Sequence, residues 1–93
     1  MDVARRRLYV GGLQEYVDEQ ILYEAFLPFG EVEKVEIPND EGRPKGFGFV
    51  LFEDEDDAKE AIENMHRAEL FGRTLTVTYS KNNAELEYDM IVD

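Results

Sequence analysis

The octapeptide Lys-Gly-Phe-Gly-Phe-Val-Leu-Phe, residues 45–52, constrains the fold of this chain more than any other stretch. Its alternating pattern predicts a central β-strand. Because successive side chains of a strand point to opposite faces, Lys45, Phe47 and Phe49 are predicted on one face, and the valine and the last phenylalanine on the other. Glycines inside a strand are expected where helices pack closely beneath it or where the backbone is approached closely from outside. The octapeptide therefore predicts a strand with one buried face and one face that presents two aromatic rings and a cation.

A second strand is predicted near the N-terminus, in the segment Leu-Tyr-Val-Gly-Gly-Leu at residues 8–13. Alternation places Leu8 and Val10 in the core and places Arg7 and Tyr9 on the opposite face. If this strand lies in the same sheet as the octapeptide, Tyr9 supplies a third exposed aromatic ring.

The remaining segments complete a mixed pattern of helices and strands. Asp18 can cap a helix that ends near Leu27, and Asp54 can cap a second helix. Further strands are predicted at residues 32–37 and 74–79. The order strand, helix, strand, strand, helix, strand is the split βαβ arrangement of ferredoxin-like domains. We therefore predict an α+β fold, a ferredoxin-like βαββαβ domain with a four-stranded antiparallel sheet and two helices packed on one face.

Length and composition limit the domain organisation. The 93 residues suffice for one small domain. We expect a disordered N-terminus at residues 1–6, the folded domain at residues 7–81, and an acidic tail, disordered or a short helix, at residues 82–93. The absence of cysteine and the single histidine exclude disulfides and thiolate or histidine-rich metal sites. Without a membrane-length apolar run or an apolar signal-peptide core, we expect a soluble intracellular protein.

The charge opposes a role in binding nucleic acid, because such proteins are expected to carry a basic surface. The chain has 22 acidic and 10 basic residues, a formal net charge of −12. The acids, however, concentrate at predicted helix starts, in loops and in the tail. The acidic run that follows Asp54 fits the first turn of a helix better than a metal site, because no ligand loop surrounds it.

The octapeptide and residues 8–13 together resemble the two signature motifs of the RNA-recognition motif family. The octapeptide matches its family motif at every position, and the resemblance covers residues 7–81. Gly12 stands where the family commonly has asparagine. Within the family, the chain is similar to the N-terminal domain of nuclear cyclophilin-type peptidyl-prolyl isomerases, whose isomerase domain is absent here.

The resemblance implies a module that binds single-stranded RNA in nuclear pre-mRNA processing and splicing. It places base stacking on Tyr9, Phe47 and Phe49, and phosphate binding on Lys45. We expect base identity to be read by main-chain groups just beyond Tyr79 and by polar side chains near them, with Ser80 and Asn83 among the candidates. We expect a monomer without cofactor, metal or membrane partner. The predicted RNA-binding residues are Tyr9, Phe47, Phe49, Lys45, Arg7, Thr76, Thr78 and Asn82.

Two other functions are weighed against RNA binding. A protein-interaction module would use the acidic helices, and relatives of that kind carry Arg-x-Phe before the last strand and lack the stacking aromatics. Here the segment reads Arg73-Thr74-Leu75 and the aromatics are retained, although a partner on the acidic helices is compatible with RNA on the sheet. An enzyme is not expected, because no nucleophile has a recognisable base partner and His66 lies beside Arg67.

Overall fold

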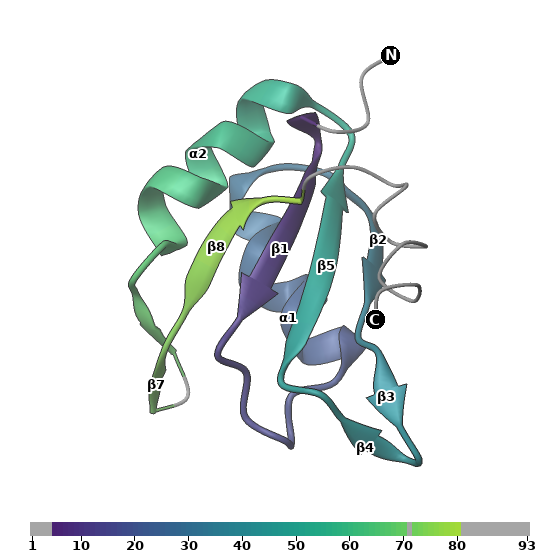
Figure 1. Cartoon of the computed structure of the whole chain (residues 1–93). Coiled ribbons are helices and arrows are strands. Elements are labelled where there is room, and N and C mark those ends of the chain that lie inside the picture. The colour runs from purple at the N-terminus through teal and green to yellow at the C-terminus, as the bar shows by residue number, and fades with distance from the viewer. Residues whose placement is uncertain (1–4, 71, 81–93) are drawn as a thin grey trace.

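The computed structural model describes residues 5–70 and 72–80, and its main feature is a four-stranded antiparallel sheet in the order β2-β5-β1-β8. Two helices cover one face of this sheet, and in Figure 1 α1 lies behind the strands while α2 lies at the upper left, beside β8. This architecture confirms the predicted ferredoxin-like fold. The strands are β1 (Arg7–Gly11), β2 (Val32–Glu36), β5 (Phe47–Phe52) and β8 (Thr76–Tyr79). The helices are α1 (Glu19–Phe26), the short 3-10 helix η2 (Leu27–Phe29) and α2 (Glu55–Met65).

Both helices begin at the aspartates predicted to cap them. The Asp18 carboxylate accepts the backbone N–H of Ile21 at 2.9 Å, and the Asp54 carboxylate accepts that of Asp56 at 3.0 Å. Each bond satisfies a backbone donor that has no partner inside its helix. The acids after Asp54 occupy the first turn of α2, near the positive end of the helix dipole.

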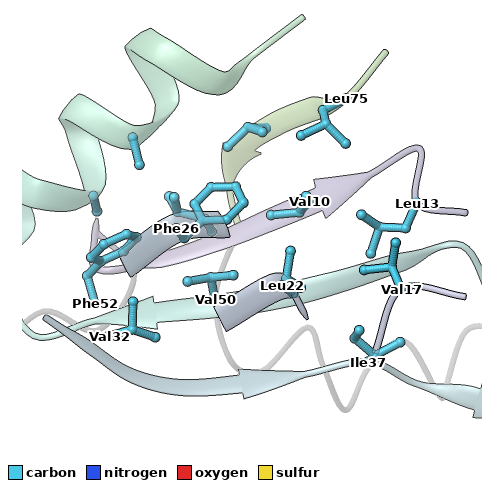
Figure 2. Packing of buried hydrophobic residues seen from close by; sticks show 14 residues of the cluster. Val10, Leu13, Val17, Leu22, Phe26, Val32, Ile37, Val50, Phe52 and Leu75 are labelled. Carbon is cyan, nitrogen blue, oxygen red and sulfur yellow. The ribbon is translucent and has the colours of Figure 1, made fainter. Parts of the chain in front are cut away.

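The core lies between the sheet and the two helices. In Figure 2, Phe26 and Leu22 of α1 point toward the side chains of Val10 and Val50 on the central strands. Phe52 is fully buried in the same layer, as alternation in the octapeptide predicts. The buried apolar side chains are Leu8, Val10, Leu13, Val17, Leu22, Phe26, Val32, Ile37, Val50, Phe52, Ala58, Ala61, Leu75 and Val77.

Two small hairpins extend from the main sheet. Strands β3 (Asn39–Asp40) and β4 (Arg43–Pro44) are joined by Glu41 and Gly42, with φ of 55° and 82°. Two consecutive positive φ values are what a two-residue type I′ turn requires. The second hairpin pairs β6 (Glu69–Leu70) with β7 (Arg73–Thr74).

The last strand is divided, whereas the sequence predicts one strand over residues 74–79. Leu75 separates β7 from β8, and its backbone N–H donates to the carbonyl of Ala68 at 2.8 Å. Its carbonyl accepts from the N–H of Arg67, also at 2.8 Å. These bonds tie the chain after α2 to the outer side of the last strand. The prediction of one continuous strand was wrong because the backbone of Leu75 bonds to Arg67 and Ala68, in the segment that follows α2.

The N-terminal edge of the described chain contacts the sheet through Arg6. Its guanidinium donates to the carbonyl of Phe52 at 2.9 Å and to the carboxylate of Glu33 at 3.1 Å, and its side chain is 11% exposed. The sequence places Arg6 before the domain, but its side chain packs on the end of β5. The predicted acidic tail at residues 82–93 lies outside the described residues. Over residues 5–70 and 72–80, neither α1 nor α2 has the length and apolar character needed to cross a membrane.

Candidate nucleic-acid interface

The three predicted stacking residues meet on the face of the sheet opposite the helices. The register of the two central strands pairs Tyr9 with Phe49 and Gly11 with Phe47. Phe47 and Phe49 are half-buried, whereas Gly48 between them is buried on the helix side. The predicted alternation is therefore confirmed, and Tyr9, Phe47 and Phe49 are called the aromatic cluster below.

The rings of the aromatic cluster contact one another but do not share a plane. The Tyr9 and Phe47 rings are stacked, with centroids 5.6 Å apart and planes 25° apart. The Phe49 ring is turned across both, at 6.0 Å and 68° from Tyr9 and at 5.7 Å and 86° from Phe47. The cluster therefore offers two nearly parallel rings and a third that stands roughly perpendicular to them.

Gly11 makes room for the Tyr9 ring, a role that was not predicted from the sequence. A side-chain Cβ at Gly11 would lie 2.7 Å from the Tyr9 hydroxyl oxygen and 2.9 Å from its Cε1 atom. The Tyr9 ring thus fills the space that a side chain would occupy, and it extends along the strand toward Phe47, the cross-strand neighbour of Gly11. A glycine two residues after an aromatic on the same strand face is the signal that could have indicated this packing.

A charged group borders the aromatic cluster on the β2 side. The Arg7 guanidinium lies over the Phe49 ring, 4.6 Å from the ring centroid, and donates to the Glu36 carboxylate at 2.9 Å. Lys34 pairs with the other oxygen of that carboxylate at 3.4 Å. With Leu51, these four residues line an open hollow of about 200 Å³. The sequence correctly predicts Arg7 on this face, but not that its guanidinium is paired with Glu36 and packed on Phe49.

Lys45 is placed differently from its prediction. The strand β5 begins only at Phe47, and Gly46 has a φ of 87° while its carbonyl accepts the N–H of Leu13 at 2.9 Å. A positive φ interrupts the alternation on which the sequence prediction relies. Lys45 is exposed at the entrance of the strand rather than being a strand residue in register with Phe47.

The polar candidates of the last strand fall into two groups. Thr78 lies opposite Tyr9 and Thr76 opposite Gly11, and both threonines are exposed beside the aromatic cluster. Ser80, by contrast, is 6% exposed, and its N–H donates to the carbonyl of Arg7 at 2.8 Å. The Ser80 side chain is thus not the exposed surface group that the sequence predicts, and the backbone bond extends the pairing of β8 with β1 by one residue. Asn82 and Asn83 lie outside the described residues.

Comparison with known proteins relates this chain to RNA-binding proteins. The family model of the RNA recognition motif matches residues 8–76. The glycine-rich RNA-binding protein GRP2A of Sinapis alba is 46% identical over 78 residues, which cover 82% of this chain and 46% of that protein. The human splicing regulator RBM11 is 44% identical over 77 residues, covering 82% of this chain and 27% of that protein. The chain thus spans about half the length of the glycine-rich relative and about a quarter of the length of the human one.

Solved structures agree with the fold and with the sequence relatives. The crystal structure of RNA-binding protein PG1 has a TM-score of 0.81 at 38% identity, covering 84% of this chain and 96% of that one. The Rna15 RRM with bound RNA (GU) has a TM-score of 0.80 at 26% identity, covering 91% of this chain and 97% of that one. Similar curated proteins include several glycine-rich RNA-binding proteins and a splicing regulator, so the finer resemblance to a cyclophilin-type isomerase is not confirmed.

Proposed function

The chain belongs to the RNA recognition motif family, and we propose that it binds single-stranded RNA by stacking unpaired bases on the aromatic cluster. The observation that carries this proposal is the meeting of Tyr9, Phe47 and Phe49 on the face opposite the helices. Unpaired bases present flat faces to aromatic rings, and each stack contributes about 1–3 kcal/mol. Stacking supplies affinity with little selectivity, so polar groups around the rings must supply base preference.

The distribution of charge is compatible with this proposal despite the net charge of −12. Among the residues that the strand register pairs on the face of the aromatic cluster, Glu36 is the acidic one. Glu33 is exposed at the register irregularity of β2 and pairs with Arg6. Many other acids are exposed on the helix side, four of them on α2 alone. These are Glu55, Asp56, Glu60 and Glu63. These charges lie on the other side of the sheet, so salt screens most of their repulsion of a bound RNA strand.

We expect weak binding, in the micromolar range or above. Among the described residues, Arg7 and Lys34 are the cations that line the hollow beside the aromatic cluster, and Lys45, Arg43 and Arg73 are exposed near the ends of the strands and on the hairpins. The Glu36 carboxylate already engages the two cations that line the hollow. About two to four phosphates are then neutralised, which is few for a nucleic-acid interface.

The experiment is a titration of the isotope-labelled chain with short oligo-A, oligo-U and mixed RNAs, followed by backbone and aromatic chemical shifts. We expect the shifts to concentrate at Tyr9, Phe47 and Phe49, and the exposed residues of α2 serve as the internal control. Shifts confined to the helices, with none on the sheet face, would contradict the proposal.

For the cellular role, we propose nuclear pre-mRNA processing. Its support is the similarity to a human protein described as a splicing regulator. Imaging of the tagged chain together with crosslinking to cellular transcripts tests the role. Nuclear signal and recovery of intron-containing RNA are expected, and exclusion from the nucleus would refute it.

A protein contact on the helix side is the second candidate function. The observation in its favour is the row of exposed acids on α2, which could bind a basic segment while RNA occupies the sheet. Titration with a basic peptide should then shift α2 resonances and leave the aromatic cluster unchanged. Displacement of bound RNA by that peptide would speak against two separate surfaces.

A further inference from the structure

The contact between Arg7 and Phe49 affects how a base can reach the ring, and this inference rests on the proposed function. The guanidinium carbon is 4.6 Å from the ring centroid, within the range of a cation–π contact. The Arg7 side chain is 12% exposed, although it belongs to one of the residue types most often found in solvent. The ring face that Arg7 covers is therefore already occupied in the protein without RNA.

Glu36 contacts Arg7 from the β2 side of the sheet. Glu36 is the cross-strand partner of Phe49 on β2, whereas Arg7 is on β1, on the other side of β5. The 2.9 Å bond between the guanidinium and the Glu36 carboxylate thus spans β5, directly across the strand that carries Phe49. This geometry draws the cation across the ring.

Lys34 adds to the stability of this arrangement. Its ammonium is 3.4 Å from the second oxygen of the Glu36 carboxylate, so that carboxylate contacts a cation through each oxygen. The Lys34 side chain is 63% exposed, so its pair is screened by salt more than the pair made by Arg7. The ion pair between Glu36 and Arg7 is therefore weakened less by salt than the pair between Glu36 and Lys34.

We propose that Glu36 is a positioning residue that holds the Arg7 guanidinium across Phe49, so that RNA must displace this cation before a base stacks on the covered ring face. Glu36 thereby lowers the affinity for RNA in two ways. It keeps one stacking surface closed, and it pairs with a cation whose charge favours contact with a phosphate.

The variant Glu36→Gln tests the proposal, because it keeps the size of the side chain and removes its charge. We expect RNA to bind about two- to fivefold more tightly, as the loss of an ion pair of this type implies. We also expect the logarithmic salt dependence of binding to become steeper by about 0.7, the effect of one additional phosphate contact on single-stranded RNA. Unchanged binding by Glu36→Gln would show that Glu36 does not lower the affinity, and weaker binding would show that Glu36 prepares Arg7 for RNA. Either result would overturn the proposal.

A double-mutant cycle separates positioning from simple repulsion of RNA by the Glu36 charge. In the Arg7→Gln background there is no guanidinium to hold, so Glu36→Gln should no longer strengthen binding. An equal gain in both backgrounds would show direct repulsion and refute a positioning role. Glu63→Gln, on the exposed side of α2, is the matched control for removing one negative charge, and its effect on affinity should be smaller than that of Glu36→Gln.

The contact itself can be measured without RNA, which keeps the failure of this inference distinct from the failure of RNA binding. In the free protein, Glu36→Gln should shift the Phe49 ring protons and the Arg7 Nε resonance. If those signals do not change, the inference is refuted even where RNA binds. If they change and the parent binds no RNA, the proposed function is refuted while the contact stands.

Discussion

Gly48 of the central strand β5 lies so close to Leu22 of α1 that a methyl group on Gly48 would be 3.1 Å from the Leu22 Cδ2 atom. The same methyl group would lie 2.8 Å from the carbonyl oxygen of Glu36, which belongs to the rigid backbone of the neighbouring strand. This glycine of the octapeptide therefore permits the close packing of helix on sheet, which is one of the two reasons that the sequence offers for a glycine here.

Gly48→Ala should destabilise the domain by about 1–3 kcal/mol, because the backbone oxygen cannot move aside easily and the core is overpacked. Urea unfolding followed by circular dichroism measures the change. Gly11→Ala is the matched control, since the nearest atoms there belong to the movable Tyr9 side chain. Equal stability of Gly48→Ala and the parent would contradict the close packing of α1.

Gly11→Ala should weaken RNA binding and have little effect on the free energy of unfolding. The added methyl group displaces the Tyr9 ring from its place beside Phe47, so up to the value of one base stack, about 1–3 kcal/mol, is lost. Fluorescence anisotropy with a labelled RNA measures the affinity. In a Tyr9→Ala background the substitution should have little further effect. A full additional loss in that background would show that Gly11 acts through something other than Tyr9.

Phe49→Ala and Phe52→Ala compare the two faces of the same strand. Phe49→Ala should weaken RNA binding by about 1–3 kcal/mol and leave the domain folded, because its ring lies on the exposed face. Phe52→Ala should reduce the free energy of unfolding by about 3–5 kcal/mol, because its ring is fully buried. Affinity and thermal unfolding are measured for both. RNA binding by Phe49→Ala as tight as that of the parent would argue against the aromatic cluster as the binding surface.

The dependence of RNA binding on salt should be modest. With about two to four phosphates neutralised, the slope of log K against log salt concentration is expected at roughly −1.5 to −3. Titrations of one short RNA at several salt concentrations give this slope. A slope steeper than about −5 would show many more phosphate contacts than the described cations provide.

Asp18→Ala should destabilise the domain by about 0.5–2 kcal/mol, because the N–H of Ile21 loses its partner at the start of α1. Denaturant unfolding provides the measurement. Asp18→Asn retains a side-chain oxygen that can accept the same bond and should recover most of the loss. If both substitutions destabilise equally, the charge near the helix dipole rather than the hydrogen bond is responsible.

Much of the fold follows from local patterns in the sequence. Alternation determines which side chains of β1 and β5 face the core, because neighbouring residues of a strand always point to opposite faces. The caps at Asp18 and Asp54 are likewise local, since each side chain bonds a backbone group two or three residues away. Such features depend on short-range geometry that the order of residues specifies directly.

Predictions from alternation fail where a positive backbone φ, or a hydrogen bond to a residue distant in sequence, interrupts a strand. The positive φ of Gly46 separates Lys45 from the strand, and the bonds of Leu75 to the residues after α2 divide the last strand. Neither departure has a sequence pattern of its own, because both depend on which segments the folded chain brings together.

By itself, the sequence determined that three aromatic rings share one face of a four-stranded sheet. Only the tertiary structure decided how those rings are arranged and what covers them. Arg7 and Glu36 are 29 residues apart. They meet because the strand register places Glu36 opposite Phe49 and Arg7 opposite Leu51, two residues farther along β5. The partner of a long charged side chain is set by register and by rotamers that depend on the surrounding surface. The strand register and the rotamers are established only when the whole chain has folded, so local sequence patterns do not predict them.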